Sequence, residues 1–500
     1  MNEKLEQLKT LLAELTDMDR TLAVVGWDQQ VYMPRGGAED RGNINSTLSA
    51  KVHEMATSKE LGDLLEALKP YAETLDPDSD DACMIKRTAY DYERASKVPT
   101  EHVAEFARVT TLGQSAWEEA KEKDDFSIFR PHLEKIVELR REYAGFFKPY
   151  DHVYDPLLQD FEPGLKTADV QDVFGKLRPE QIKIIKAIKD RPQVDDSFLK
   201  TSYDVKGQEE FGVEVAKAFG YDFNRGRQDV SVHPFTTSLG IDDVRITTHY
   251  YPEHVTTAMF STMHESGHAM YEQGISPSLR RLPQATGASM AVHESQSRLW
   301  ENLIGRSKAF WKRFYPRLQK IFPAQLANVS LEAFYKAVNK VEPSFVRTEA
   351  DEATYNLHIM LRLELEIALM EDSLKVKDLP AAWNARMHEF LGITPPNDRR
   401  GVLQDVHWSG GMLGYFPTYA LGNLVSAQIM EKMKSQLSDI DGLIEDGRFD
   451  VILGWLRENI YRHGAKFEPQ ELVQRVTGTK IRPEPYLAYL SKKYSDIYGF

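Results

Sequence analysis

Cysteine is almost absent from this chain of 500 residues, in which Cys83 is the only one. One cysteine can form neither an intramolecular disulfide nor a cysteine-rich metal site, so a reducing compartment fits the sequence. No apolar run approaches the roughly 20 residues that a helix needs to cross a bilayer, and no apolar stretch typical of a signal peptide follows the charged opening MNEKLEQLKT. We therefore expect a cytoplasmic protein without a membrane partner.

An excess of positive charge is also missing. The chain has 76 acidic and 62 basic side chains, which gives a formal net charge of −14. Such a protein has no general affinity for phosphate backbones, so nucleic acid is not an expected partner. With 42% hydrophobic and 28% charged residues, the composition is typical of a folded globular protein.

Helical periodicity dominates the chain. Apolar residues recur at steps of three and four, as in Leu5, Leu8 and Leu12 and again in the range 356–374. The length suits two to four average domains or one large helical unit, and the Pro- and Gly-containing stretches indicate interhelical turns rather than linkers. We predict a mainly α single domain over residues 1–500, with a helical N-terminal part to about residue 228 and a catalytic part from about residue 229.

One segment departs from the helical pattern. Between Asp229 and Tyr251, β-branched residues alternate with polar ones at Val244, Ile246 and Thr248, after a turn signal at residues 240–243. This pattern predicts a small antiparallel sheet of two or three strands inside a helical protein.

Histidine is concentrated in the same region. Six of the 14 histidines lie between His233 and His293, where an even spread would place about 1.7. Within this range, His264-Glu265-Ser266-Gly267-His268 forms an H-E-x-x-H pattern. On a helix, residues four apart share a face at about 5–6 Å, close enough for both imidazoles to bind one zinc ion.

A catalytic zinc usually has a third protein ligand and an open position for water. Glu272 lies about 6 Å further along the helix than His268, so we expect it to support the site or to lie on the surface. The metzincin spacing is excluded, because Tyr271 and Gly274 stand where that class has Gly and His. Glu294, on a second predicted helix, is the best candidate ligand.

Glu301 lies seven residues after Glu294, so the two carboxylates share a helix face, and one can bind the metal while the other supports an imidazole. A salt bridge to Arg298 is the competing explanation for either glutamate. Glu265, next to His264, is placed to accept a proton from a zinc-activated water and to pass it to a leaving amine. The predicted reaction class is peptide hydrolysis.

The sequence resembles the carboxypeptidase Taq family of metallocarboxypeptidases, which are gluzincins with a helical architecture and a closed cleft. The resemblance extends over essentially the whole chain and does not depend on H-E-x-x-H alone. The further matching motifs are His233-Pro234-Phe235, Asp243-Val244-Arg245-Ile246-Thr247, His293-Glu294-Ser295, Arg347-Thr348-Glu349-Ala350-Asp351, and Gly401 with Gln404-Asp405 and His407-Trp408.

The resemblance implies a large helical metallopeptidase with a deep cleft beside the small sheet. It implies the removal of single C-terminal amino acids from peptide substrates, with broad side-chain tolerance. It also implies Zn²⁺ as the metal, with Co²⁺ as a substitute, Glu294 as the third ligand and a homodimer.

A carboxypeptidase must bind a terminal carboxylate, for which the planar fork of arginine is suited. Arg245 and Arg347 lie in the family motifs, and we prefer Arg347, because Asp243 on the same strand face can already neutralise Arg245. We expect Arg245 to shape the closed end of the cleft. His233 is a further candidate for substrate binding.

Three residues near the C-terminal third are candidates for contact with the transition state. His407 belongs to a family motif, although a structural pair with Asp405 is an equal alternative. Tyr415 and Tyr419 can donate hydrogen bonds to a developing oxyanion, and aromatic packing competes with this role for each.

Two other functions stay open at this point. The protein can be a helical zinc endopeptidase or oligopeptidase, or a non-catalytic scaffold that zinc only stabilises. Glu265 argues against the scaffold, because a structural zinc recruits four protein ligands and does not need an uncoordinated carboxylate beside it.

Overall fold

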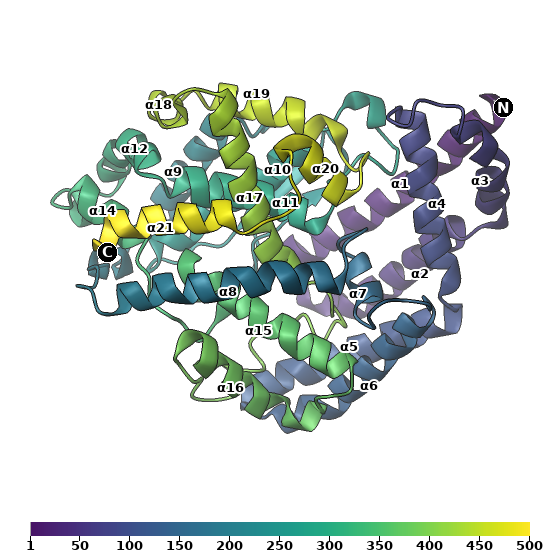
Figure 1. The fold of residues 1–500 in the computed structure, drawn as a ribbon, viewed down its shortest axis with the longest axis horizontal. Coiled ribbons are helices and arrows are strands. Elements are labelled where there is room, and N and C mark those ends of the chain that lie inside the picture. The colour runs from purple at the N-terminus through teal and green to yellow at the C-terminus, as the bar shows by residue number, and fades with distance from the viewer. Residues whose placement is uncertain (1) are drawn as a thin grey trace.

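The computed structural model describes residues 2–500 and shows a helical protein with one small sheet (Figure 1). The predicted periodic segments are helical: Leu5, Leu8 and Leu12 are buried in the first helix, and most of the range 356–374 falls in a long buried helix that ends at Met370. The α-helices are α1 (Asn2–Val31), α2 (Ala38–Ala56), α3 (Lys59–Ala72), α4 (Asp80–Lys97), α5 (Thr100–Lys123), α6 (Phe126–Gly145), α7 (Asp155–Gln159), α8 (Thr167–Lys189), α9 (Val205–Phe219), α10 (Val255–Gln273), α11 (Met290–Arg298), α12 (Lys308–Ile321), α13 (Pro323–Leu326), α14 (Leu331–Val338), α15 (Glu352–Met370), α16 (Leu379–Leu391), α17 (Pro417–Gln436), α18 (Ile440–Asp446), α19 (Phe449–Asn459), α20 (Pro469–Thr477) and α21 (Glu484–Tyr498).

The main hydrophobic core contains side chains from Cys83 to Tyr498, so it crosses the predicted boundary near residue 228. A smaller cluster packs α1 against α3 and the start of α4. Segments distant in sequence lie side by side, as α8 and α21 do across the front of Figure 1. None of the helices in residues 2–500 is long and apolar enough to cross a membrane.

The sheet contains three short strands in the order β1-β3-β2: β1 (Gln228–Val230), β2 (Thr236–Ser238) and β3 (Val244–Thr248). The predicted antiparallel pairing is correct for β2 and β3 and wrong for β1 and β3, which run parallel. The reason is that β1 and β2 flank β3 and run in opposite directions, so only one of them can be antiparallel to it. Both β2 and β3 pack against α10, which places the sheet beside the H-E-x-x-H motif.

The second motif helix continues in an unexpected form. Ser289 caps α11 by accepting a hydrogen bond from the Val292 N–H. After Arg298 the helix widens into a π-helical segment, η4 (Leu299–Gly305). Such widened turns are frequent at functional sites.

Candidate metal centre and active site

The helix α10 presents His264 and His268 on one face, one turn apart, with their ring centroids at 4.9 Å. Gly267 allows α11 to approach this helix closely: a Cβ atom there would lie 2.7 Å from the Gln296 carbonyl oxygen and from the Ser297 Cα. The small residue inside the motif therefore has a packing reason, which is to bring a second helix to the two imidazoles.

The helix α11 brings Glu294 to the same point. A second glycine makes room for it, because a Cβ at Gly422 of α17 would lie 2.6 Å from the Glu294 Cγ. The start of α11 is fixed by Glu162, whose Oε1 accepts a hydrogen bond of 2.5 Å from the Ala291 N–H. Helices α10, α11 and α17 thus determine the position of the Glu294 carboxylate.

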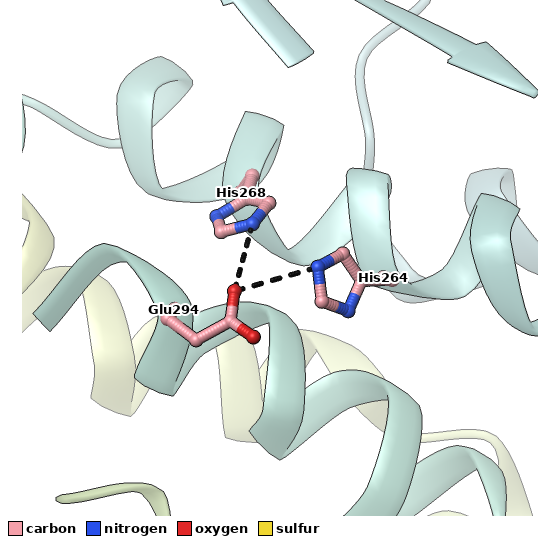
Figure 2. A group of neighbouring side chains, drawn as sticks. All are labelled: His264, His268 and Glu294. Atoms are coloured by element: carbon pink, nitrogen blue, oxygen red, sulfur yellow. Dashed lines mark ion pairs between the residues drawn. The ribbon is translucent and has the colours of Figure 1, made fainter. Parts of the chain in front are cut away.

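Three side-chain atoms converge in Figure 2: the Nε2 atoms of His264 and His268 and the Oε2 atom of Glu294. The two nitrogens lie 3.5 and 3.4 Å from that oxygen. Tetrahedral zinc with bonds of about 2.1 Å separates its ligands by about 3.4 Å, so the donors have the spacing and the chemistry of a zinc site. Among the side chains that the structure describes, this is the one group of three or more His, Cys, Asp or Glu residues arranged to hold a metal ion.

Each imidazole is held from its other side. The Nδ1 atom of His264 lies 2.9 Å from Oε2 of Glu301. The Nδ1 atom of His268 lies 2.6 Å from Nδ1 of His293, whose Nε2 is 3.0 Å from Oε1 of Glu272. Such partners fix the tautomer and orientation of a ligating histidine and leave Nε2 free for the metal.

The charges around the three donors favour a cation. Burial lowers the pKa of His268 to about 3, so its ring is neutral. Burial also acts to lower the pKa of His264, but the carboxylates of Glu294 and Glu301 outweigh it and raise that pKa to about 10. The site thus stabilises positive charge at the position where the imidazole of His264 faces Glu294.

Glu265 lies beside these donors but does not belong to the group formed by His264, His268 and Glu294. Its side chain is buried, with 5% of the residue surface exposed, and burial raises its pKa. Its Oε2 accepts a hydrogen bond of 2.6 Å from the Thr236 hydroxyl of β2. A carboxylate near the metal position that does not ligate it has the geometry of a proton acceptor.

A second charged cluster contains Arg347. The guanidinium groups of Arg347 and Arg362 share one carboxylate, that of Asp405, with N–O distances of 3.0 and 2.5 Å. Arg347 also donates a hydrogen bond of 3.0 Å to the Tyr355 hydroxyl. Burial lowers the pKa of His407 to about 4, so this residue is neutral and the cluster retains one net positive charge.

The candidate transition-state residues lie together beside this cluster. The His407 Nε2 is 3.3 Å from the Tyr419 hydroxyl, and the Tyr415 and Tyr419 rings contact edge to face at 5.2 Å. Burial, together with the charge of Glu294, raises the pKa of Tyr415 to about 12, so its hydroxyl remains a donor at neutral pH. The His407–Asp405 pair is loose, at 3.9 Å.

The remaining candidates, Arg245 and His233, form no hydrogen bond or ion pair with the three donors in the described residues. Arg245 donates both arms of its fork to Asp243, at 2.9 and 2.8 Å, and stacks 4.3 Å above the Trp27 ring of α1. Asp243 therefore neutralises Arg245, as expected in the sequence analysis, where Arg347 was preferred for the terminal carboxylate. His233 lies in the exposed turn between β1 and β2.

Thr236 and Arg362 were missed in the sequence analysis, and His293 was named there as part of a motif without its role in supporting His268. None of these roles has a spacing signal, because each residue acts through contacts made across the fold. Glu272 is buried, with 2% of its surface exposed, so the expectation of a surface position is wrong and that of a supporting one fits.

A cavity of about 680 Å³ lies between α1, the start of α4 and residues 278–282, and none of the three donors lines it.

Comparison with known proteins agrees with this geometry. The family model described as carboxypeptidase Taq (M32) metallopeptidase matches residues 7–494. The protein belongs to the carboxypeptidase Taq family. A thermostable carboxypeptidase 1 of Thermus thermophilus is 41% identical over 95% of both chains, and carboxypeptidase 1 of Bacillus subtilis is 38% identical over 98% of this chain and 97% of its own.

Solved structures give the same result for the fold. The M32 carboxypeptidase from Deinococcus radiodurans superposes with a TM-score of 0.96 at 40% identity, over the full length of both chains. The Pyrococcus furiosus carboxypeptidase superposes at 0.94 and 37% identity, over 99% of each chain. The protein is therefore a metallocarboxypeptidase of the carboxypeptidase Taq family, and the predicted fold class and enzyme class are confirmed.

Proposed function

We propose that this carboxypeptidase uses a zinc ion at His264, His268 and Glu294, with Glu265 as the general base, to remove C-terminal amino acids one at a time. The observation that carries the proposal is the set of three converging donors with an uncoordinated carboxylate beside it. Two imidazoles and one carboxylate leave a fourth position open, which is typical of catalytic zinc. Co²⁺ is expected to substitute, because it accepts the same nitrogen and oxygen donors.

A bound metal ion and the side chains around it would have different roles in the reaction. A bound zinc ion would polarise a water molecule and the scissile carbonyl. Glu265 would take the proton from the attacking water and deliver it to the leaving amine. Tyr415, Tyr419 and His407 are the candidates to donate hydrogen bonds to the oxyanion, since their polar atoms lie together beside the Arg347 cluster.

The free C-terminus of a peptide would bind near Arg347. Two arginines share Asp405, so a substrate carboxylate would neutralise the remaining positive charge. The substrate backbone would add to the free edge of β2, beside α10. Arg20 of α1 donates a hydrogen bond of 2.6 Å to the Ser238 carbonyl oxygen at one end of this strand and so limits the free edge.

The remaining features of the proposal rest on the family and on the composition. We infer peptide substrates with broad side-chain tolerance, a deep cleft along α10, a homodimer and a cytoplasmic location, with His233 contacting substrate and Arg245 shaping the closed end of the cleft. The charge of −14 speaks against a nucleic-acid partner, and the single cysteine fits a reducing compartment.

Incubation of the zinc-loaded protein with a defined peptide, followed by mass measurement of the products, tests the proposal. Stepwise loss of single residues from the C-terminus is the expected result. Internal cuts would instead indicate an endopeptidase, and an inactive protein with bound zinc would indicate a scaffold. Glu265→Gln is the matched variant, in which we expect retained zinc and turnover reduced by about 10²–10⁴.

A further inference from the structure

Thr236 connects the sheet to the proposed general base. It lies in the edge strand β2, opposite Ile246 of β3. Its Oγ1 is 2.6 Å from Oε2 of Glu265 and 3.1 Å from the carbonyl oxygen of the same residue. The hydroxyl therefore reaches from the sheet to α10 and contacts one oxygen of the carboxylate.

The other oxygen of that carboxylate is left free. Among the groups that the structure describes, only the Thr236 hydroxyl forms a hydrogen bond with the Glu265 carboxylate. Oε1 of Glu265 is not sealed from solvent. In this it differs from Oε2 of Glu272, which is buried without a hydrogen-bond partner. Thr236 thus holds Oε2, while Oε1 stays accessible.

The position of Thr236 is itself fixed by buried hydroxyl groups. Thr247, which is fully buried, accepts a hydrogen bond of 2.9 Å from the Phe235 N–H at its Oγ1, and its own N–H donates to the Phe235 carbonyl oxygen at 2.9 Å. Ser231 donates a further hydrogen bond of 2.6 Å to the same Oγ1. The residue immediately before Thr236 is therefore clamped to β3, which limits the freedom of β2.

We propose that Thr236 is a positioning residue for Glu265, in which the threonine hydroxyl fixes Oε2 and so directs Oε1 to the water that attacks the peptide. The terminal torsion of a glutamate side chain is soft, so a single anchored oxygen decides where the second one points. This inference rests on the proposed role of Glu265 as the general base.

The test compares three variants of the zinc-loaded enzyme. Thr236→Val keeps the shape of the side chain and removes the hydroxyl, Thr236→Ser keeps the hydroxyl, and Thr237→Val is a control one residue along the same strand. We expect Thr236→Val to lower kcat by about tenfold or more, the usual effect of losing a hydrogen bond to a charged group, with unchanged KM, zinc content and melting temperature. Thr236→Ser and Thr237→Val should retain kcat.

A double-mutant cycle separates this inference from the proposed function. If Thr236 acts through Glu265, then adding Thr236→Val to Glu265→Gln should lower kcat no further. A full additional loss in the double variant, or a normal kcat in Thr236→Val when Glu265→Gln is impaired, would overturn the role of Thr236 alone. A loss of zinc in Thr236→Val would also overturn it, because the hydroxyl would then support the metal site. Normal kcat in Glu265→Gln would instead refute the proposed general base.

Discussion

The Nε atom of Arg298 lies 2.7 Å from Oε1 of Glu294, while Oε2 of the same carboxylate faces the two imidazoles. Arg298 also approaches Oε2 of Glu301 at 3.3 Å and stacks 4.6 Å above the ring of Tyr355. One guanidinium therefore holds the outer oxygen of the proposed ligand and contacts the carboxylate that supports His264. The charge of Arg298 opposes the effect of burial and keeps the pKa of Glu294 well below its usual range.

Arg298→Met is expected to weaken zinc binding by about 10–100-fold, the range for losing a partner that orients a ligand. The reason is that Glu294 loses the hydrogen bond that points Oε2 at the imidazoles. Competition with a chelator of known affinity measures the effect, with Arg475→Met on the protein surface as the control. Tighter zinc binding in Arg298→Met would show that the arginine mainly repels the metal and does not orient Glu294.

Replacing His264, His268 or Glu294 with alanine should lower metal content and activity together, because two protein ligands rarely retain the ion. Metal analysis after dialysis, paired with a peptide assay, measures both. Glu301→Gln should behave differently and keep zinc at high concentration with weaker affinity, since among the three proposed ligands Glu301 contacts only His264, at the Nδ1 atom that faces away from the metal position. Stoichiometric zinc in Glu294→Ala would remove Glu294 from the ligand set.

Local patterns in the sequence predict much of this site, and long-range contacts account for the rest. The spacing of His264 and His268 fixes one helix face, and the sequence predicts a second helix that carries Glu294. These are properties of single helices. The parallel pairing of β1 with β3 depends instead on how the chain folds back on itself, so alternation within one segment cannot reveal it.

Contacts between side chains from distant segments are also not predictable from local sequence patterns. His293 supports His268 because α10 and α11 pack closely at Gly267, and no pattern within either helix indicates which side chains meet there. Arg362 lies in an apolar helix that the sequence assigns to the core. Its charge is accommodated because Asp405, 43 residues later, reaches it, and Gln404 accepts a further hydrogen bond.

Arg347→Ala should reduce kcat/KM for peptides with a free C-terminus by about 2–4 kcal/mol, as expected for losing one side of a buried charged pair. Peptides with an amidated C-terminus should be affected much less, since they lack the carboxylate. Arg245→Ala is the matched control, because its fork is already occupied by Asp243. A loss confined to Arg245→Ala would reverse the assignment of the two arginines.

Gly422→Ala should reduce both zinc affinity and activity. A Cβ at this position would lie 2.6–2.7 Å from the Cγ and Cβ atoms of Glu294, so the ligand or the helix α17 would have to move. Gly454→Ala in α19 is the control, since no atom lies within 4 Å of a Cβ placed there. The control should be neutral or stabilised by up to about 1 kcal/mol in thermal unfolding. Full zinc affinity in Gly422→Ala would show that this close approach is dispensable.

Glu162 is a buried acid whose side chain contacts the start of α11. Glu162 is 1% exposed, and burial raises the pKa of its carboxyl to about 8, although the hydrogen bond from the Ala291 N–H opposes the shift. The folded protein therefore keeps this proton between about pH 4.3, the ordinary value for glutamate, and pH 8, while the unfolded chain releases it. Because the folded state then binds more protons, stability is full below that ordinary value and declines as the pH rises through about 8.

Glu162→Gln should remove this part of the pH dependence. The amide oxygen can still accept the Ala291 hydrogen bond, but the side chain can no longer ionise in its buried position. The melting temperature of the variant relative to the wild type should therefore increase from pH 5 to pH 9, with exposed Glu253→Gln showing no such change. A difference that stays constant across this range would mean that Glu162 does not titrate in the folded protein, and that its carboxylate is held at the helix start in one protonation state throughout.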